Sequence, residues 1–461
     1  MGRYFGTDGF RGEANKVLTV DHAFQIGRFL GWYFNESKRR NGQAERAKVT
    51  IGKDTRRSSY MFEYALAAGL TASGADAYLL HVTTTPSVSY VARTDGFDCG
   101  IMISASHNPF RDNGIKIVNR YGEKAEEELI ALIEDYLDGK LCVFGQAWKE
   151  LPYATGENIG RSIDYAEGRN RYVGYLISLG KHSFKGLKIG LDCANGAAWQ
   201  IAKSVFDALG ATTYVIAAEP NGLNVNLDCG SKNLNRLKTL VKEKELTVGF
   251  AFDGDADRCL CVDGSGKEID GDDVLYICGK YLKERGELSQ NTVVGTVMSN
   301  LGLVNGLKEE GIETVRTAVG DRFVYEYMQR NGLRLGGEQS GHVIFSKYAT
   351  TGDGVLTSLK LMEVALEKKS SLTALAKGFH KYPQKTVNLR VEERQAAVED
   401  SEVLASVKEM EEMLGEKGRV LVRVSGTEPL VRVMAEAETE ELCNRVVERV
   451  CAALKARGYA K

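Results

Sequence analysis

The sequence predicts an α/β protein of four domains, the first three similar units with mixed, largely parallel sheets and the last a smaller α+β domain. At 461 residues, 43% of them hydrophobic, the chain is long enough to bury several cores. A pattern of apolar strand, polar loop, helix, closing glycine and second strand occurs three times. Near the C-terminus, strands such as KTVNLRV and RVLVRV alternate instead with helices such as the one ending in ERVCAALKARG.

The three copies predict β-α-β units with right-handed crossovers, whose ligand loops lie at the carboxyl ends of the strands. The copies are KVTIGKDTRRSSYMFEYALAAGLTASGADAYLL, LKIGLDCANGAAWQIAKSVFDALGATTYVI and TVVGTVMSNLGLVNGLKEEGIETVRT, closed by Gly74, Gly210 and Gly311. Breaks in the apolar rhythm near KELPYATGENIGR and EVALEKKSSL indicate domain boundaries. We expect domains I to IV at residues 1–155, 156–263, 264–375 and 376–461.

The composition argues against several classes of protein. Lys and Arg number 60 and Asp and Glu 62, a net charge of -2, and no long block of one sign offers a nucleic-acid or membrane surface. We expect a cytoplasmic protein, because the sequence shows neither a secretory signal nor an apolar run that could span a bilayer. Nine scattered cysteines without a C-x-x-C pair suit a reducing compartment, and six histidines without a spaced pair give zinc little support.

The strongest local signal is FAFDGDADRCLCVD, in which Asp253, Asp255 and Asp257 alternate directly after an apolar strand. Crowded carboxylates repel one another unless a hard cation is present, and ligation by oxygen suits Mg2+. The triad therefore predicts a magnesium site, with a solvated acidic loop as the alternative. An EF-hand is excluded, because Arg258 and Gly264 stand where its glycine and glutamate belong.

A second signal is CGIMISASHNPFRDNGIKIV, a buried strand that leads into Ser104, Ser106, His107 and Asn108. A hydroxyl at a strand end can accept a phosphoryl group and present it to a bound metal. An ordinary capped turn explains the same residues equally well. Lys116 follows, either with its ammonium in the same cleft or as a surface lysine.

A third signal is the glycine-rich segment RLGGEQSGHVIF. It concentrates Glu338, Gln339, Ser340 and His342, whose polar groups suit the hydroxyls of a sugar. A hairpin turn accounts for the glycines, but not for so many hydrogen-bonding groups in one place.

Two further segments offer groups for phosphate. LVRVSGTEPLVRV combines a Ser-Gly-Thr turn with flanking arginines, an arrangement typical of a phosphate nest, although a plain hairpin turn is the commoner occurrence. FGTDGFRG carries Arg11 beside a glycine-rich turn and is weak evidence when taken alone. The residues of the predicted nest are Arg423, Ser425, Gly426, Thr427 and Arg432.

The motifs together resemble the alpha-D-phosphohexomutase superfamily, and within it the bacterial branch that acts on phosphoglucosamine. FGTDGFRG, SASHNP, DGDADR, GGEQSGH and RVSGTEPLVR occur in the order typical of that family and cover nearly the whole chain. The resemblance implies four domains, of which the first three are alike. The chain departs from the family pattern at Ala256, where glycine is usual, and at Val424, where proline is common.

The resemblance also implies roles for the residues of these motifs. Ser106 would be the phosphorylated residue, and its phosphate would bind one Mg2+ with Asp253, Asp255 and Asp257. Arg258 would contact the phosphoserine. Glu338, Gln339 and Ser340 would bind the sugar. The substrate's phosphate would be bound by Arg423, Ser425, Gly426, Thr427 and Arg432. The candidates for positioning or proton transfer, which the sequence does not rank, are Arg11, His107, Lys116 and His342.

By the same resemblance, the chain would interconvert glucosamine 6-phosphate and glucosamine 1-phosphate through a bound glucosamine 1,6-bisphosphate, which could also prime the enzyme. This reaction feeds the synthesis of UDP-N-acetylglucosamine and cell-wall precursors. Gln339 favours glucosamine, because the other branches often have an apolar residue there. The expected partner is a small-molecule sugar phosphate, with neither nucleic acid nor membrane; a homodimer is the assembly considered, but the sequence does not reveal the oligomeric state.

Three alternatives remain open. Within the superfamily, the chain could be a phosphomannomutase or phosphoglucomutase. More remotely, Asp253 could be the nucleophile and Asp255 the acid of a magnesium phosphatase, although Asp257 stands where that class has threonine or valine. A non-catalytic sugar-phosphate binding protein would be expected to lack Ser106 or the triad, and both are present.

Overall fold

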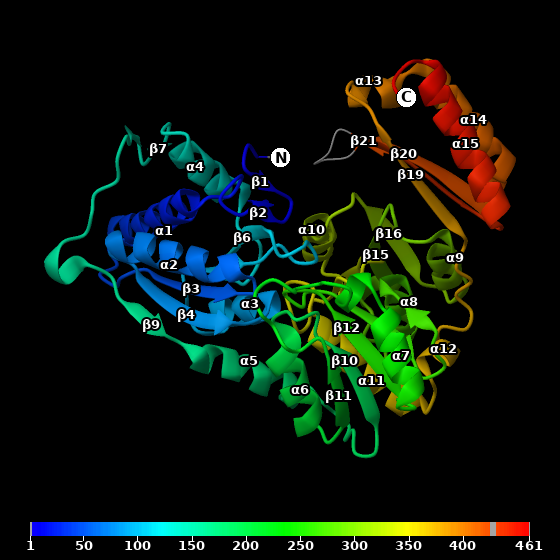
Figure 1. Ribbon diagram of the computed structural model, residues 1–461, viewed down its shortest axis with the longest axis horizontal. Coiled ribbons are helices and arrows are strands. Elements are labelled where there is room, and N and C mark those ends of the chain that lie inside the picture. The colour runs from blue at the N-terminus through cyan, green and yellow to red at the C-terminus, as the bar shows by residue number, and fades with distance from the viewer. Residues whose placement is uncertain (1, 425–429, 461) are drawn as a thin grey trace. The chain divides into compact units, whose positions relative to one another are not determined.

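The computed structural model describes residues 2–424 and 430–460, and the chain divides into two compact units. Unit 1 comprises Met1–Val297 and Val315–Ala376, and unit 2 comprises Met298–Thr314 and Lys377–Lys461. Figure 1 shows the helices and strands of both. Among the described residues, no helix has the length and apolar character that a membrane crossing requires.

The first sheet of unit 1 has seven strands in the order β1-β2-β6-β5-β3-β4-β9. β3 pairs in parallel with β4 and β5, and β4 pairs in parallel with β9, whereas β1, β2 and β6 form antiparallel pairs. The strands are β1 (Phe5–Gly6), β2 (Gly9–Glu13), β3 (Lys48–Lys53), β4 (Asp76–Val82), β5 (Cys99–Ile103), β6 (Asp112–Asn119) and β9 (Ser162–Asp164). β7 (Cys142–Val143) and β8 (Gln146–Ala147) form a separate hairpin.

The second and third sheets repeat the mixture of parallel and antiparallel pairs. The second has the order β11-β10-β12-β13-β14 and the third β16-β15-β17-β18. The strands are β10 (Lys188–Asp192), β11 (Thr212–Ile216), β12 (Val248–Phe252), β13 (Cys259–Asp263), β14 (Glu268–Ile269), β15 (Thr292–Thr296), β16 (Glu313–Thr317), β17 (Leu335–Gly337) and β18 (Val343–Phe345).

Helices connect these strands, and α1 and α2 lie side by side against the first sheet (Figure 1). The helices of unit 1 are α1 (Val20–Arg40), α2 (Arg57–Ala72), α3 (Thr85–Thr94), α4 (Glu127–Leu137), α5 (Ala166–Ser178), α6 (Ala198–Ala208), α7 (Asn235–Glu243), α8 (Gly271–Glu284), α10 (Asp321–Asn331), α11 (Gly354–Lys368) and α12 (Leu372–Leu375).

Unit 2 contains a three-stranded antiparallel sheet in the order β19-β21-β20. Its core combines valines of the sheet with the apolar faces of two helices. The elements are α9 (Leu301–Glu309), β19 (Gln384–Arg390), α13 (Arg394–Glu399), α14 (Ser401–Leu414), β20 (Gly418–Val424), β21 (Leu430–Ala437) and α15 (Glu440–Ala456). The predicted α+β character of the C-terminal region is confirmed.

The three predicted β-α-β copies correspond to β3-α2-β4, β10-α6-β11 and β15-α9-β16. The strands of the first two copies pair in parallel, and those of the third are neighbours in their sheet. Each closing glycine has a positive φ, 83° at Gly74, 95° at Gly210 and 65° at Gly311. This left-handed conformation favours glycine, because a Cβ atom would crowd the backbone.

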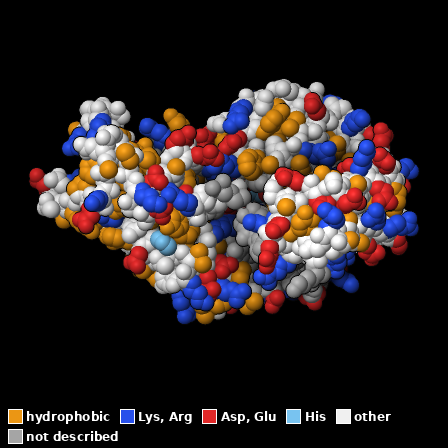
Figure 2. Space-filling model, turned by 90° about the horizontal axis from the view of Figure 1, so that it is seen from above, with side chains coloured by type: hydrophobic (Ala, Val, Ile, Leu, Met, Phe, Trp, Pro, Cys, Tyr) orange, Lys and Arg blue, Asp and Glu red, His pale blue; other side chains and the backbone are white. Residues whose placement is uncertain are grey.

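On the face shown in Figure 2, side chains of Lys and Arg are interspersed with those of Asp and Glu. This distribution agrees with the nearly balanced charge of the sequence. The segments that carry the candidate site are buried instead: they follow the carboxyl ends of β5 and β12, each a strand of five buried residues. The interior sheets thus hold the site's loops in place.

Candidate functional site

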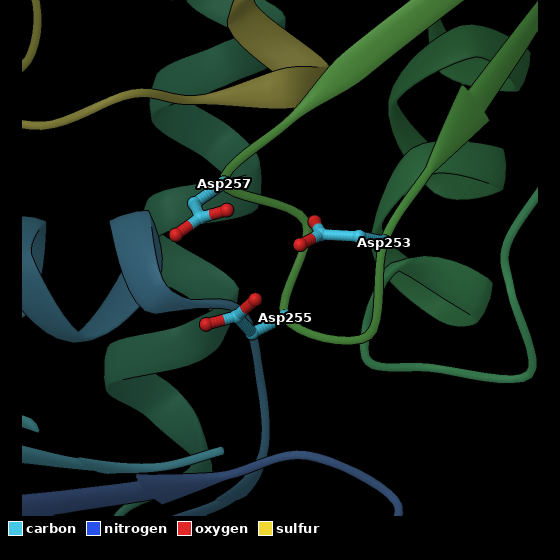
Figure 3. Close-up of side chains that lie close together, drawn as sticks. All are labelled: Asp253, Asp255 and Asp257. Carbon is cyan, nitrogen blue, oxygen red and sulfur yellow. The ribbon is translucent and has the colours of Figure 1, made fainter. Parts of the chain in front are cut away.

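The acidic triad lies in the loop between β12 and β13. Asp253, Asp255 and Asp257 are at most 3% exposed, and each offers a carboxylate oxygen within 4.8 Å of the others. Figure 3 shows the three carboxylates directed toward a common centre. Ala256 adopts φ 56°, a conformation that explains why glycine is usual there. The alternative of a solvated acidic loop is wrong.

Two of the three carboxylates have raised pKa values, whereas Lys116 and His342 outweigh burial and lower the pKa of Asp257. Burial and the charges of Asp257 and Asp255 raise the pKa of Asp253 well above its ordinary value, and burial and Asp257 raise that of Asp255. Among the described residues, Oδ1 of Asp255 and Oδ1 of Asp257 are buried without a hydrogen-bond partner. Buried carboxylate oxygens without partners are costly, so the three residues fit a divalent ion with oxygen ligands.

Ser106 lies beside this triad, in the loop that follows β5. Its side chain is 1% exposed, and its hydroxyl donates to Oδ2 of Asp253 at 2.5 Å. The backbone has φ 52°, which is strained for a serine, so the surrounding contacts must hold it. Nδ1 of His107 lies 3.3 Å from the same hydroxyl. Ser106 and the triad therefore lie side by side, and their shared role in one site stays a prediction.

Two residues that the sequence did not single out hold the Ser106 loop. The Arg56 guanidinium donates to the backbone oxygen of Ser106 at 2.8 Å and to that of Asn108 at 2.9 Å. Asp54 accepts from Arg56 Nε at 2.7 Å and from the Ser104 hydroxyl at 2.7 Å. The hydroxyl of Ser104 in turn accepts from the N–H of Ser106. This buried network fixes the direction of the Ser106 side chain.

Lys116, on β6, is buried and contacts three carboxylates. Its ammonium lies 2.7 Å from Asp255, 3.2 Å from Asp257 and 3.2 Å from Asp8. Burial opposes the charged form, but Asp255, Asp8 and Asp257 raise the pKa of Lys116 well above its ordinary value. The alternative of a surface lysine is wrong, and the side chain remains a cation beside the triad.

Arg11 and His342 take part in a network of alternating charges around Lys116. The Arg11 guanidinium forms an ion pair with Asp8. Asp8 also accepts from Lys124 at 3.0 Å, and Lys124 lies 2.7 Å from Asp321. His342 links this network back to the triad, because its Nε2 lies 3.6 Å from Asp321 and its Nδ1 lies 3.8 Å from Asp257. The sequence did not identify Asp8, Lys124 or Asp321; only Asp8 lies within a motif.

The two remaining polar residues of the loops differ in their charge. Burial, together with the positive charges of Arg258 and Lys232, lowers the pKa of His107 to about 3, so its imidazole is neutral near pH 7. The N–H of Arg258 donates to Oδ1 of Asp253 at 3.3 Å, and its guanidinium Nε lies 3.9 Å from Asp257. The site therefore places a neutral imidazole among several cations, which include Lys116 and Arg258.

The glycine-rich segment forms a hairpin turn between β17 and β18, as its alternative interpretation expected. The N–H of Gly341, at φ 92°, donates to the Glu338 carbonyl, and the Gly341 carbonyl accepts from the N–H of Cys259 directly after the acidic loop. The Glu338 carboxylate accepts from the N–H of Gly320 at 3.0 Å and contacts the Ser340 hydroxyl at 3.5 Å. The turn thus lies next to the triad loop.

A cavity of about 420 Å3 reaches this site, and its lining includes Asp8, Lys116, Lys124, Asp257 and Asp321. In volume it falls within the usual range for small-ligand sites. Both signs of charge line it, so that a ligand with hydroxyls and an anionic group would find donors and acceptors there.

Comparison with known proteins identifies the family. The models of phosphoglucomutase/phosphomannomutase domains match in order: alpha/beta/alpha domain I at residues 2–141, domain II at 170–266, domain III at 270–382 and the C-terminal domain at 387–453. The chain belongs to the phosphoglucomutase/phosphomannomutase family. The predicted superfamily and its four domains are therefore confirmed.

Among its relatives, the phosphoglucosamine mutase of Lachnospira eligens is 61% identical over 460 residues, which is 100% of each chain. Solved structures with this fold include the following two. A phosphoglucomutase/phosphomannomutase family protein of Burkholderia thailandensis has a TM-score of 0.78 at 24% identity, over 100% of this chain and 99% of the other. The N-acetylphosphoglucosamine mutase of Aspergillus fumigatus, in complex with GlcNAc-6P and magnesium, has a TM-score of 0.69 at 18% identity, over 99% and 96%.

The two described arginines of the predicted phosphate nest lie in unit 2. Arg423 on β20 is the register partner of Arg432 on β21. Burial and the positive charge of Arg432 lower the pKa of Arg423. Ser425, Gly426 and Thr427 lie outside the described residues.

Proposed function

We propose that the chain is a phosphoglucosamine mutase that interconverts glucosamine 6-phosphate and glucosamine 1-phosphate. One observation carries the proposal: the Ser106 hydroxyl is hydrogen-bonded at 2.5 Å to a buried aspartate of a three-carboxylate cluster. A serine so placed can hold a phosphoryl group next to a cation. The 61% identity to a phosphoglucosamine mutase over the full chain supports the choice of substrate.

In the proposed reaction, the oxygen of the substrate's free hydroxyl forms a bond to the phosphorus of phosphoserine 106 as the Ser106 Oγ–P bond breaks. The glucosamine 1,6-bisphosphate produced turns around and returns its other phosphoryl group to Ser106 Oγ. The hydroxyl proton needs an acceptor, and the neutral His107 is available 3.3 Å from Ser106. Lys116 neutralises charge on the transferring group, because it stays protonated.

One Mg2+ is the proposed cofactor, held by Asp253, Asp255 and Asp257 together with the phosphate on Ser106. When bound, it supplies positive charge that stabilises the transferring phosphoryl group. The unpartnered oxygens of Asp255 and Asp257 support this assignment. Arg258, whose backbone N–H donates to Asp253, is proposed to contact the phosphoserine through its guanidinium group.

We assign substrate recognition to two segments. Glu338, Gln339 and Ser340 would bind the sugar, since the turn that carries them is hydrogen-bonded through Gly341 to Cys259, directly after the triad loop. The substrate's own phosphate would be bound by Arg423, Ser425, Gly426, Thr427 and Arg432, with the paired arginines as support. The positioning roles of Arg11 and His342, a cytoplasmic location and a homodimer remain predictions.

A comparison of rates tests the substrate. The purified enzyme is assayed with Mg2+ and glucose 1,6-bisphosphate on the 1-phosphates of glucosamine, mannose and glucose. We expect the highest kcat/KM on glucosamine 1-phosphate. Equal or higher values on mannose or glucose phosphate would favour a phosphomannomutase or phosphoglucomutase, and release of inorganic phosphate as the main product would favour a phosphatase.

A further inference from the structure

A second cavity in unit 1, of about 710 Å3, shares no lining residue with the acidic triad or the Ser106 loop. It lies at the carboxyl ends of β3 and β4, where Lys53 and His81 line it, and is completed by residues from α2, α5 and α6. None of its lining residues, all of which the structure describes, is acidic. Its size is in the range of sites for small ligands, and its charge favours an anion.

Two arginines give the cavity uncompensated positive charge. Among the described residues, Arg57 and Arg169 form no ion pair and no side-chain hydrogen bond. The other basic side chains already have acidic neighbours: Lys53 forms a buried ion pair with Glu63, and His81 lies 3.5 Å from Asp164 and 3.9 Å from Glu63. The two arginines are therefore the groups available to a phosphate, which guanidinium binds through paired hydrogen bonds.

The helices around the cavity add to this charge. Residues from the first turns of α2, α5 and α6 line it, namely Arg57, Arg169 and Trp199. None of the three helices has a side-chain hydrogen bond at its N-cap, and α2 and α6 have no acidic residue in the first turn. The N-termini of α2 and α6 thus contribute partial positive charge to the cavity, whereas Glu167 offsets that of α5.

Aromatic rings narrow the class of ligand. Tyr60 is 43% exposed, and Trp199 is partly exposed on the first turn of α6. A flat ring that stacks on an aromatic side chain, combined with phosphate groups, is the chemistry of a nucleotide. We propose that this cavity binds a nucleotide, its phosphates on Arg57 and Arg169 and its base against Tyr60 or Trp199.

The cavity is connected to the Ser106 loop through both of its walls. Arg57 follows Arg56, which donates to the backbone oxygens of Ser106 and Asn108. The N–H of Arg57 donates to Gly222 in the opposite wall at 3.0 Å, and four residues later Asn226 donates to the same Ser106 oxygen at 2.9 Å. A nucleotide that orders this segment therefore also restrains the Ser106 loop.

Calorimetric titration of the full chain with ATP and with UTP tests the proposal. The titrations contain EDTA and saturating glucose 1,6-bisphosphate, so that nucleotide binding at the triad or in the catalytic cavity adds nothing to the measured heat. We expect one site per chain, with binding at least tenfold weaker in Arg57→Gln/Arg169→Gln. The control Arg445→Gln, an exposed arginine on α15 of unit 2, should bind as the wild type does.

Hydrogen exchange of the peptide that contains Ser106 provides a second measurement that needs no enzyme activity. We expect the nucleotide to slow its exchange in the wild type and not in the double variant. The proposal is overturned if neither nucleotide binds at about 1 mM. It is also overturned if glucose 1,6-bisphosphate displaces the bound nucleotide, or if inorganic phosphate binds as tightly as the nucleotide does. None of these outcomes would affect the proposed mutase reaction, which the substrate assay tests separately.

Discussion

Replacing Lys116 by methionine tests how the triad is held when no metal is bound. Methionine keeps most of the apolar stem but removes an ammonium that lies within 3.2 Å of Asp8, Asp255 and Asp257. Removing one partner of a buried ion pair costs about 3–5 kcal/mol, because the remaining charges stay buried without compensation. We expect K116M to unfold at a clearly lower temperature than the wild type in EDTA.

The same reasoning predicts how magnesium acts on the variant. The ammonium and a divalent cation neutralise the same carboxylates, so Mg2+ should raise the thermal midpoint of K116M by more than that of the wild type. Lys53→Met is the matched control, since Lys53 is also buried and paired, but with Glu63 and away from the triad. We expect that control to be destabilised without any added response to Mg2+.

Scanning fluorimetry in EDTA and over a Mg2+ series measures both effects. Equal midpoints of K116M and wild type in EDTA would show that the lysine does not compensate the triad. An identical Mg2+ response of the two proteins would show that lysine and metal do not share the carboxylates.

Three further predictions concern other parts of unit 1. Glu338→Ala should lower kcat/KM on glucosamine 1-phosphate roughly 10- to 100-fold, the value of a hydrogen bond to a charged group; unchanged kinetics would remove Glu338 from the sugar site. Burial raises the pKa of Asp353 to about 6 from 3.8, so its contribution to stability is full below pH 3.8 and is lost as the pH rises through 6. This pH dependence of the unfolding free energy amounts to roughly 3 kcal/mol. Asp353→Asn should weaken it in thermal scans over a pH series, and an unchanged pH profile of the variant would contradict the prediction. Lys124→Met and Asp321→Asn, whose charges lie 2.7 Å apart, should shift the midpoint non-additively in a double-mutant cycle, whereas simple additivity would refute their coupling.

The sequence was sufficient for features that depend on local patterns. The triad and the repeated β-α-β units follow from short segments, in which strand ends and turn residues carry the information, whereas the role of Ser106 rests on the resemblance of five motifs along the chain. Local patterns could not decide whether these residues form a functional site or an exposed loop, because burial is a property of the whole fold. The structure decides it for Asp253, Asp255 and Lys116, all of which are buried.

The features that sequence reasoning missed depend on contacts between distant segments. Lys124 meets Asp8 across 116 positions and Asp321 across 197, and neither lysine nor aspartate spacing signals such pairs. Arg56 holds the Ser106 loop from 50 positions away, although RRSS looks like an ordinary polar loop. Such charge networks arise only when several sheets place their strand ends together.

Locating the phosphoryl group tests the central claim most directly. The protein is incubated with Mg2+ and glucose 1,6-bisphosphate, digested, and its phosphopeptides are mapped by mass spectrometry, with Ser106→Ala as the comparison. We predict an acid-stable phosphate on Ser106 of the wild type, and neither phosphate nor mutase activity in Ser106→Ala. An acid-labile phosphate on Asp253, or full activity of Ser106→Ala, would contradict the assignment of Ser106 as the phosphoryl carrier.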